Sequence, residues 1–386
     1  MKRHFATFSL RHMAISTFLT VFLAGCTATG PGVGTENIPG KTIGNGSVKV
    51  ALILPLSGSA STAGQSMLKA AELAHKNISK AGITILVKDD ASSPSQAKAA
   101  ASAALAEGAE IILGPLTANQ TQSVAEVSRS AGKPVISFST DTTVASPGVY
   151  LMGFLPQAET EQIISYAAAQ GKKSIAALIP QSAYGNVVEA ALLETASRKG
   201  IRIALVERYA EGQAFTAAKK IVPLVTGDNP EADALFLPDS GTGMNTVNTA
   251  LQSAGFNAAK VKLLGTGVWA RSGIFSLSMF QGAWFTAPDT SGYHAFVNQY
   301  RSQYGNDPVR VASQTYDAVS LVAALVRTQG AQRFSESVLT NSAGFAGADG
   351  VFRFRSNGTN DRALAIFEVQ SGSSRIIRAA PKSFSR

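Results

Sequence analysis

The stretch that decides the fold is Val48-Lys49-Val50-Ala51-Leu52-Ile53-Leu54, which continues as Pro55-Leu56-Ser57-Gly58. A short, almost uncharged run rich in aliphatic and β-branched side chains predicts a strand buried on both faces. The residues from Gln65 to Ile78 are rich in alanine and follow the apolar period of a helix. A buried strand followed by a helix predicts the first half of a βαβ unit, in which the strands lie parallel.

The same alternation continues along the chain in two series. The first series has further predicted strands at 83–87, 111–113 and 134–137 and helices at 95–105 and 121–130. The second series starts near Glu159, with strands predicted at 174–179, 202–206, 234–237 and 262–264 and helices at 162–169, 187–198, 214–225 and 244–254. Each series predicts a doubly wound, Rossmann-like sheet, so the fold class is α/β with two lobes.

The remainder of the chain supports the same organisation. Two more helical stretches follow Pro288, around 296–304 and 314–328, and a strand-rich tail with a turn at Asn357-Gly358 runs over 350–376. Neither half has a fixed short period, which excludes a repeat solenoid.

The N-terminus has the pattern of a secretory signal peptide, predicted to cover residues 1–25. Lys2, Arg3 and Arg11 precede an apolar run from Met13 to Phe22, which is shorter than the ~20 residues of a membrane-spanning helix. Residues 26–47 are rich in Gly, Thr and Pro and are predicted to form a flexible tether.

Cys26 is the only cysteine of the chain, so no internal disulfide can form. Leu23-Ala24-Gly25-Cys26 resembles a bacterial lipobox, in which the cysteine carries the lipid and becomes the first residue of the mature protein. The resemblance implies a domain anchored by acyl chains to a membrane of the cell envelope, facing the periplasm. In lipoproteins of this kind, an aspartate directly after the cysteine resembles a signal for retention in the inner membrane. Thr27 occupies this position, which slightly favours the outer membrane.

Composition argues against several function classes. The chain has 34 basic and 25 acidic residues, scattered without a basic run, which disfavours nucleic-acid binding. After the leader only His75 and His294 remain, so neither a metal site nor another cofactor is expected. No common catalytic motif occurs, and we expect a protein that is not an enzyme.

Several segments resemble the leucine/isoleucine/valine-binding family of type I periplasmic binding proteins. Leu54-Pro55-Leu56-Ser57-Gly58, Leu113-Gly114-Pro115-Leu116-Thr117 and Tyr184-Gly185 resemble the family's ligand loops. The most specific match is the segment from Tyr300 to Pro308 together with Tyr316-Asp317-Ala318. The resemblance runs from about Val48 to Arg378.

The resemblance implies two lobes joined by three crossovers, with a ligand cleft between them. We expect the crossovers near 155–161, 283–290 and 345–354. The N-terminal lobe would then comprise 48–158 and 286–347, and the C-terminal lobe 159–285 and 348–386.

Candidate ligand contacts of the first lobe lie in three loops at strand ends. Ser57 and Ser59 could bind a carboxylate or cap the following helix, and the same two interpretations hold for Thr117 and Asn119. Ala118 stands where amino-acid-binding members of the family carry a serine, which disfavours a simple amino-acid ligand. The third loop, which contributes a carboxylate, contains Ser139, Thr140 and Asp141.

The second lobe offers three candidates at its own strand ends. Tyr184 could stack on a ligand or pack at the base of a loop. Asp239 could pair with a ligand ammonium, and the Trp269 indole could stack on a ligand or fill the edge of the lobe.

Two functions remain open on the sequence. The first is a solute-binding lipoprotein that delivers an amino-acid-like molecule to an ABC permease. The second is an outer-membrane activator of a penicillin-binding protein, because Leu54 to Gly58 and Gly114-Pro115-Leu116 also resemble the C-terminal domain of such activators. The first function predicts small-molecule affinity and the second a protein partner.

Overall fold

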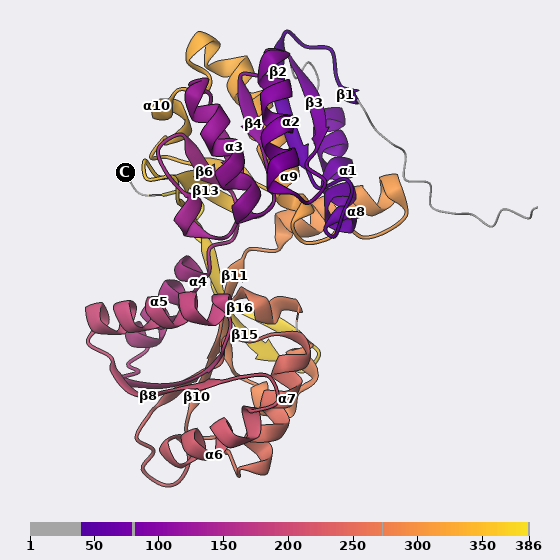
Figure 1. Ribbon diagram of the computed structural model, residues 1–386. Helices are drawn as coiled ribbons and strands as arrows, with labels where there is room; N and C mark the ends of the chain where they lie inside the picture. The colour runs from indigo at the N-terminus through magenta and orange to yellow at the C-terminus, as the bar shows by residue number, and fades with distance from the viewer. Residues whose placement is uncertain (1–39, 79–81, 272, 385–386) are drawn as a thin grey trace, which may run out of the picture. The chain divides into compact units, whose positions relative to one another are not determined.

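The computed structural model describes residues 40–78, 82–271 and 273–384, so the predicted signal peptide, most of the tether and Cys26 lie outside the described residues. From Pro39 to Arg386 the chain forms one compact unit that contains two large sheets (Figure 1). The helices of the described part include none long and apolar enough to cross a membrane.

The first sheet has six strands and belongs to the N-terminal lobe. In spatial order they are β1 (Thr42–Ile43), β3 (Ile83–Asp89), β2 (Val48–Leu54), β4 (Ile111–Leu113), β5 (Val135–Ser137) and β6 (Val149–Leu151). The strands from β3 to β6 are parallel, as the sequence predicts, and β1 pairs antiparallel with β3 at the edge.

The β1 strand corrects the expected tether. Residues 42–43 fall inside the predicted tether 26–47, yet Thr42 pairs with Leu86 and Ile43 with Ile85. Both residues are β-branched and suit a short edge strand, and their pairing covers the open edge of β3.

Helices cover both faces of this sheet. One face packs against α2 (Pro94–Ala106) and α3 (Ala118–Ser130), through alanines of α2 that meet Ala51 and Ile53. The other face is covered by α1 (Ser61–Asn77) and α9 (Ala312–Thr328), which pack side by side. Burial on both faces explains why β2 is a continuous apolar run.

The second sheet has seven strands. In spatial order they are β16 (Ser373–Arg378), β15 (Leu364–Gln370), β11 (Trp284–Pro288), β10 (Lys262–Gly265), β9 (Ala234–Phe236), β7 (Ser174–Pro180) and β8 (Arg202–Tyr209). Side chains alternate along β7: Ala176 and Leu178 meet α6 (Ala214–Val225) and α7 (Gly241–Ser253), while Ile175 and Ile179 meet α4 (Pro156–Ala169) and α5 (Ala183–Lys199).

The third crossover lies later in the chain than expected. A small sheet of β12 (Phe345–Gly347), β13 (Gly350–Phe354) and β14 (Asn360–Arg362) is bonded to the first lobe, where Asn360 donates to the carbonyl of Leu151 at 2.7 Å. The crossover therefore falls between β14 and β15 and not at 345–354. Earlier in the chain, the segment between β6 and α4 and the segment after β11 also pass between the parts that contain the two large sheets.

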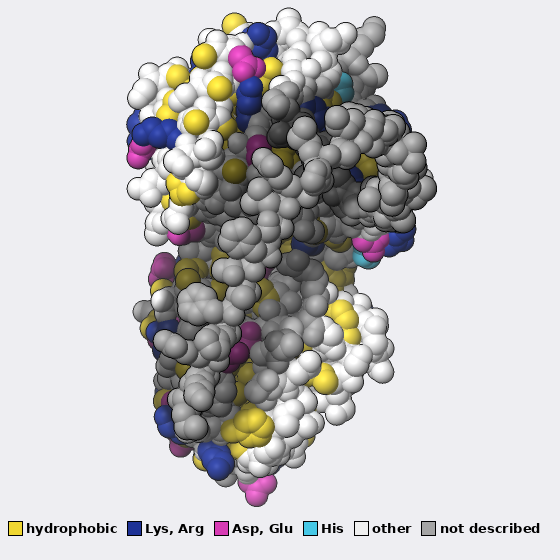
Figure 2. Space-filling view, turned by 45° about the vertical axis from the view of Figure 1, so that its right-hand side comes forward, with side chains coloured by type: hydrophobic (Ala, Val, Ile, Leu, Met, Phe, Trp, Pro, Cys, Tyr) yellow, Lys and Arg dark blue, Asp and Glu magenta, His cyan; other side chains and the backbone are white. Residues whose placement is uncertain are grey.

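Two further helices belong to the first lobe, α8 (Ser291–Tyr304) and the short α10 (Glu336–Leu339). On the face shown in Figure 2, basic side chains of the described residues lie scattered among neutral atoms rather than gathered in one patch.

Candidate functional site

A cavity of about 510 Å³ lies where the two lobes meet, and both lobes line it. Leu116, Phe138 and Thr140 follow the carboxyl ends of β4 and β5, and Tyr184 and Gly267 follow those of β7 and β10. Open α/β sheets bind ligands at this edge. The lining residues that matter below are Phe138, Thr140, Phe154, Glu159, Tyr184, Gly267, Tyr293, His294, Arg310 and Gln314. The volume is in the usual range for a small-molecule site.

Glu159 places a carboxylate in the cavity wall. It lies in the first turn of α4, where the helix dipole favours a negative charge, and its side chain accepts a hydrogen bond from the backbone N–H of Gly267 at 3.0 Å. A Cβ atom at position 267 would come within 2.6 Å of the Glu159 carboxylate. Only glycine at this position leaves room for the carboxylate in this place.

Tyr184 faces the cavity from the second residue of α5. Its hydroxyl lies 2.6 Å from the Thr266 hydroxyl. Burial, together with the nearby charge of Glu159, raises the pKa of Tyr184 well above its ordinary value. The phenol is therefore neutral at every physiological pH and presents a ring and a fixed hydroxyl.

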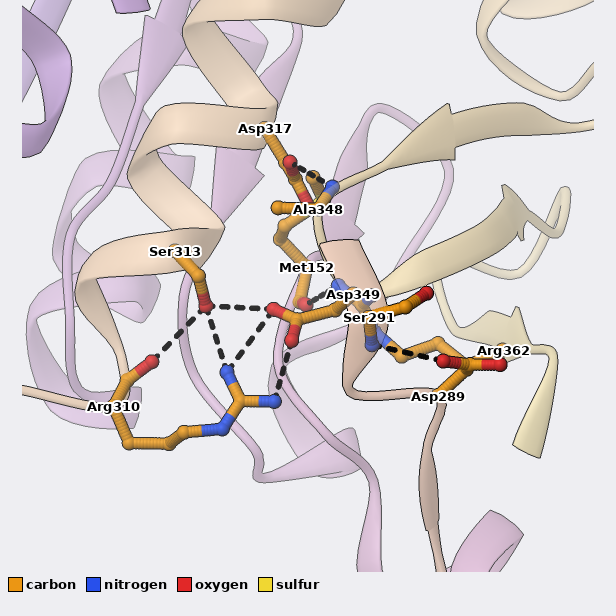
Figure 3. Close-up of polar contacts among 9 residues, drawn as sticks. All are labelled: Met152, Asp289, Ser291, Arg310, Ser313, Asp317, Ala348, Asp349 and Arg362. Carbon is orange, nitrogen blue, oxygen red and sulfur yellow. Dashed lines mark hydrogen bonds and ion pairs between the residues drawn. The ribbon is translucent and has the colours of Figure 1, made fainter. Parts of the chain in front are cut away.

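Arg310 contributes the positive charge of the cavity. Its guanidinium donates from Nη2 to Asp349 Oδ1 at 2.5 Å and from Nη1 to Asp349 Oδ2 at 3.1 Å, and Ser313 joins the same pair (Figure 3). The guanidinium also lies 4.1 Å from the ring centre of Tyr293 and 4.5 Å from that of Phe154. Two rings and a bidentate carboxylate hold the group in one orientation.

Further buried charges lie behind this wall. Arg362 donates to the carbonyl of Met152 at 2.6 Å, and the Asp317 carboxylate accepts from the backbone N–H of Ala348 at 2.7 Å (Figure 3). Burial, reinforced by the charge of Asp349, raises the pKa of Asp317 to about 7. The cluster ties α9 to the turn between β12 and β13, which lies close to the third crossover.

Gln314 is the polar side chain of the cavity whose bonding is incomplete. It lies in the first turn of α9 and is 2 % exposed. Among the described residues, no hydrogen-bond partner meets its Oε1 atom. A buried acceptor without a partner costs about 1–3 kcal/mol, so such atoms in native proteins call for an explanation.

One of the expected first-lobe contacts lines the cavity, and the others do not. Thr140 lines the cavity, whereas the buried Ser139 hydroxyl accepts from the Asp141 backbone N–H at 3.1 Å. Asp141 caps the short helical turn that follows it, accepting from the Thr143 N–H at 2.9 Å. Both residues shape the loop and do not line the cavity.

The loops after β2 and β4 also point elsewhere. The Ser57 hydroxyl donates to Asp89 at 2.6 Å, and Ser59 is exposed. Thr117 and Asn119 are exposed at the start of α3. The cavity is lined instead by Leu116, the residue directly before Thr117.

In the second lobe, Tyr184 lines the cavity but two other expected contacts do not. The Asp239 carboxylate accepts hydrogen bonds from the Tyr209 hydroxyl and from the backbone N–H of Ser240. Trp269 is fully buried, donates to the carbonyl of Leu237 at 3.0 Å and packs against Phe280. Its indole belongs to the core, and the expected stacking on a ligand does not fit this position.

The sequence interpretation missed Glu159, Arg310 and Gln314, although all three line the cavity. Each lies at or just before the start of a helix rather than at the end of a strand. Glu159 lies within the first predicted crossover, and a polar residue in a segment that crosses a ligand cleft is the signal that could have identified it. Arg310 and Gln314 carried no comparable signal. Within the described ranges, no group of three or more potential metal ligands comes together.

Comparisons with known proteins agree with this architecture. The family model described as "Periplasmic binding protein" matches residues 47–374, whereas no curated protein matches the chain. A putative branched-chain amino acid ABC transporter protein from Rhodospirillum rubrum is similar in structure, with a TM-score of 0.74 and 19% identity over 86% of this chain and 99% of the other.

Two further structures are similar at lower scores. A leucine-binding protein from Thermotoga maritima has a TM-score of 0.60 and 19% identity over 86% of this chain and 98% of its own. A solute-binding protein from R. palustris in complex with benzoate has a TM-score of 0.61 and 20% identity over 88% and 98%. At these identities the likeness shows the fold alone. The family model spans most of the chain, and the protein therefore belongs to the periplasmic binding proteins, an extracytoplasmic family of solute-binding proteins rather than enzymes.

Proposed function

We propose that the protein binds an amino acid or a similar small polar solute in the cavity between its lobes and delivers it to an ABC permease. The observation that carries the proposal is the pair of opposite charges in one cavity. Glu159 stands on the second-lobe side, and Arg310 stands on the first-lobe side. A solute with an ammonium and a carboxylate group matches both charges.

The proposal assigns the ammonium to Glu159, not to Asp239 as the sequence suggested. Glu159 lines the cavity, whereas Asp239 does not line it and accepts hydrogen bonds from Tyr209 and Ser240. Tyr184 and Thr140 would complete the contacts from the two lobes. A solute that touches both lobes would stabilise the arrangement in which both contacts form, which is how hinged binding proteins respond to ligands.

The similar structures support a small-molecule ligand without fixing its class. One is a leucine-binding protein, and another is a solute-binding protein in complex with benzoate. Both molecules combine a carboxylate with an apolar body, and the lining of the cavity, with Phe138 and Tyr184 beside charged groups, suits that combination.

We also propose that the protein is a lipoprotein, because Leu23-Ala24-Gly25-Cys26 follows the apolar run of the leader. The acyl chains on Cys26 would hold the domain at a membrane facing the periplasm. Thr27 slightly favours the outer membrane. The alternative role, activation of a penicillin-binding protein, would use the same fold with a protein partner in place of a solute.

The test is a thermal-shift screen of the full chain against amino acids, aromatic carboxylates, sugars and muropeptides, followed by calorimetry. A ligand at 100 times its dissociation constant adds ~2.7 kcal/mol to the free energy of unfolding. The variant Glu159→Gln should weaken binding of an amine-bearing ligand about tenfold to a hundredfold, because a hydrogen bond to a charged group contributes ~1.5–3 kcal/mol.

The matched control is Glu161→Gln, two residues further along α4, where the carboxylate is half exposed and pairs with Arg198. This variant should leave the affinity unchanged. If no solute binds and a penicillin-binding protein retains the chain in a pull-down, transport is wrong and the activator role takes its place.

A further inference from the structure

The unsatisfied acceptor of Gln314 narrows the class of solute. The side chain is almost completely buried and borders the cavity, and its Oε1 atom has no partner among the described residues. An acceptor in this state gains a full hydrogen bond when a ligand brings a donor, because no competing protein contact has to be broken.

Hydrogen bonds hold the helix start that carries Gln314. The Gln314 N–H bonds to the carbonyl of Val311 at 3.1 Å as α9 begins. Its neighbour Ser313 donates to Asp349 at 2.6 Å, within the pair that holds Arg310. Gln314 therefore lies in a helix start whose backbone and neighbouring side chains are held by hydrogen bonds.

The walls beside Gln314 are mainly apolar and aromatic. Phe138, Phe154, Tyr184 and Tyr293 all border the same cavity. Rings prefer offset or edge-to-face contact with other rings. Phe154 and Tyr293 already pack on Arg310, and such walls favour a flat apolar body over an open-chain polyol.

We propose that the cavity selects aromatic solutes that carry a hydrogen-bond donor, a hydroxyl or an amine, and that Gln314 Oε1 accepts from this donor. The inference rests on the proposed function and adds the class of ligand and the residue that sets specificity. Glu159 and Arg310 orient the charged end of the solute, and Gln314 distinguishes a donor-bearing solute from its donor-free analogue. A site built to form a hydrogen bond with the solute rejects the analogue that lacks the donor, because the buried acceptor of the site is then left without a partner.

The experiment compares matched probes on the full chain by calorimetry. One pair is L-tyrosine and O-methyl-L-tyrosine, and the other is 4-hydroxybenzoate and 4-methoxybenzoate. The members of each pair differ mainly in the donor, and the two pairs differ in whether an ammonium is present. We expect at least one hydroxyl probe to bind, and to bind about three- to tenfold more tightly than its methyl ether.

Three variants locate the effect. Gln314→Met removes the amide at nearly constant shape and should abolish the preference for the hydroxyl probe. Gln314→Glu keeps an acceptor and should retain the preference. Gln120→Met, a replacement of another buried glutamine that does not line the cavity, should leave the preference as in the wild type.

A second measurement separates binding from folding. Replacing an unsatisfied buried amide with an apolar side chain of similar shape is neutral or stabilising. The melting temperature of ligand-free Gln314→Met should therefore equal or exceed that of the wild type while its selectivity is lost. A fall in melting temperature together with unchanged selectivity would overturn the proposal.

The outcomes also separate this inference from the proposed function. If an aliphatic amino acid binds and Gln314→Met binds it equally well, the protein remains a solute-binding protein and the inference about Gln314 is wrong. If the methyl ethers bind as tightly as the hydroxyl probes, the inference also fails. If nothing in the wider screen binds, the proposed function itself fails.

Discussion

The Arg310 guanidinium and the Asp349 carboxylate form a two-point ion pair in which both carboxylate oxygens accept hydrogen bonds, at 2.5 and 3.1 Å. Asp349 is fully buried, whereas Arg310 reaches the cavity. The pair therefore joins the candidate binding site to the turn between β12 and β13.

Removing one partner of this pair should cost stability. Asp349→Asn leaves a largely buried guanidinium without its counter-charge, which should lower the free energy of unfolding by about 3 kcal/mol. The midpoint of urea unfolding measures the loss. Asp307→Asn is the matched control, because it breaks an exposed pair with Arg301 and should not shift the midpoint measurably. Equal shifts of the urea midpoint in both variants would show that burial of the Arg310 pair contributes nothing to the free energy of unfolding.

The stability of the protein should depend on pH through Asp317. Burial raises its pKa in the folded state to about 7, so between about pH 4 and 7 the folded chain holds a proton that the unfolded chain releases. The free energy of unfolding should therefore fall as the pH rises through this window. Burial raises the pKa of Asp90 to about 6, so this carboxyl group changes the stability in the same direction.

The variant Asp317→Asn isolates this contribution. Between pH 4 and 7 the free energy of unfolding of this variant should fall less than that of the wild type. The fall that remains in the variant is due to Asp90 and should end near pH 6. Parallel stability curves for wild type and variant, measured by urea unfolding in a series of buffers, would contradict the assignment.

Trp269 should affect folding and not ligand affinity. Its indole is buried against Phe280 and bonds to the carbonyl of Leu237, so Trp269→Ala should lower the free energy of unfolding by about 3–5 kcal/mol. Trp269→Phe, which keeps the packing better, should fold well enough for calorimetry and bind solute as the wild type does. A large loss of affinity in the phenylalanine variant would return Trp269 to the ligand site.

Gly267 should control the position of the Glu159 carboxylate. An added methyl group would lie 2.6 Å from it, so Gly267→Ala should displace the carboxylate and weaken binding of an amine-bearing solute roughly tenfold. In the double variant with Glu159→Gln the alanine should add little, because both changes act on one contact. Fully additive losses in calorimetry would indicate that Gly267 acts on its own.

Cys26 should determine how the protein is attached to the cell envelope. Because it is the only cysteine, Cys26→Ser disturbs no disulfide and should only prevent lipidation. The variant should move from the membrane pellet to the soluble extract, as fractionation and immunoblotting would show. Retention of the variant in the pellet through an acyl group would refute the lipobox interpretation.

The sequence predicted the fold well where burial is continuous. β2 occupies the predicted residues Val48 to Leu54, and α6 occupies the predicted residues Ala214 to Val225, since apolar period and length define such elements. The third crossover was misplaced because β12, β13 and β14 are short and partly polar, and only their bonds to Leu151 and Gly153 reveal the lobe to which they belong.

The candidate site was harder to predict. Tyr184 and Thr140 follow strands and line the cavity. Asp239 and Trp269 also follow strands, but their side chains point to other partners. The direction of a side chain depends on tertiary packing, which spacing along the chain does not report. Glu159, Arg310 and Gln314 reach the cavity only because the crossovers bring helix starts from distant parts of the chain to one place.

The interleaved order of the lobes has a consequence for the newly made protein. The first lobe is incomplete until α9 and β14 have followed the whole of the central segment, and the second sheet lacks β15 and β16 until Arg378. A chain that emerges from the ribosome N-terminus first therefore cannot close either core until synthesis is nearly finished. The order of the strands thus makes the C-terminal segment a structural requirement of both lobes.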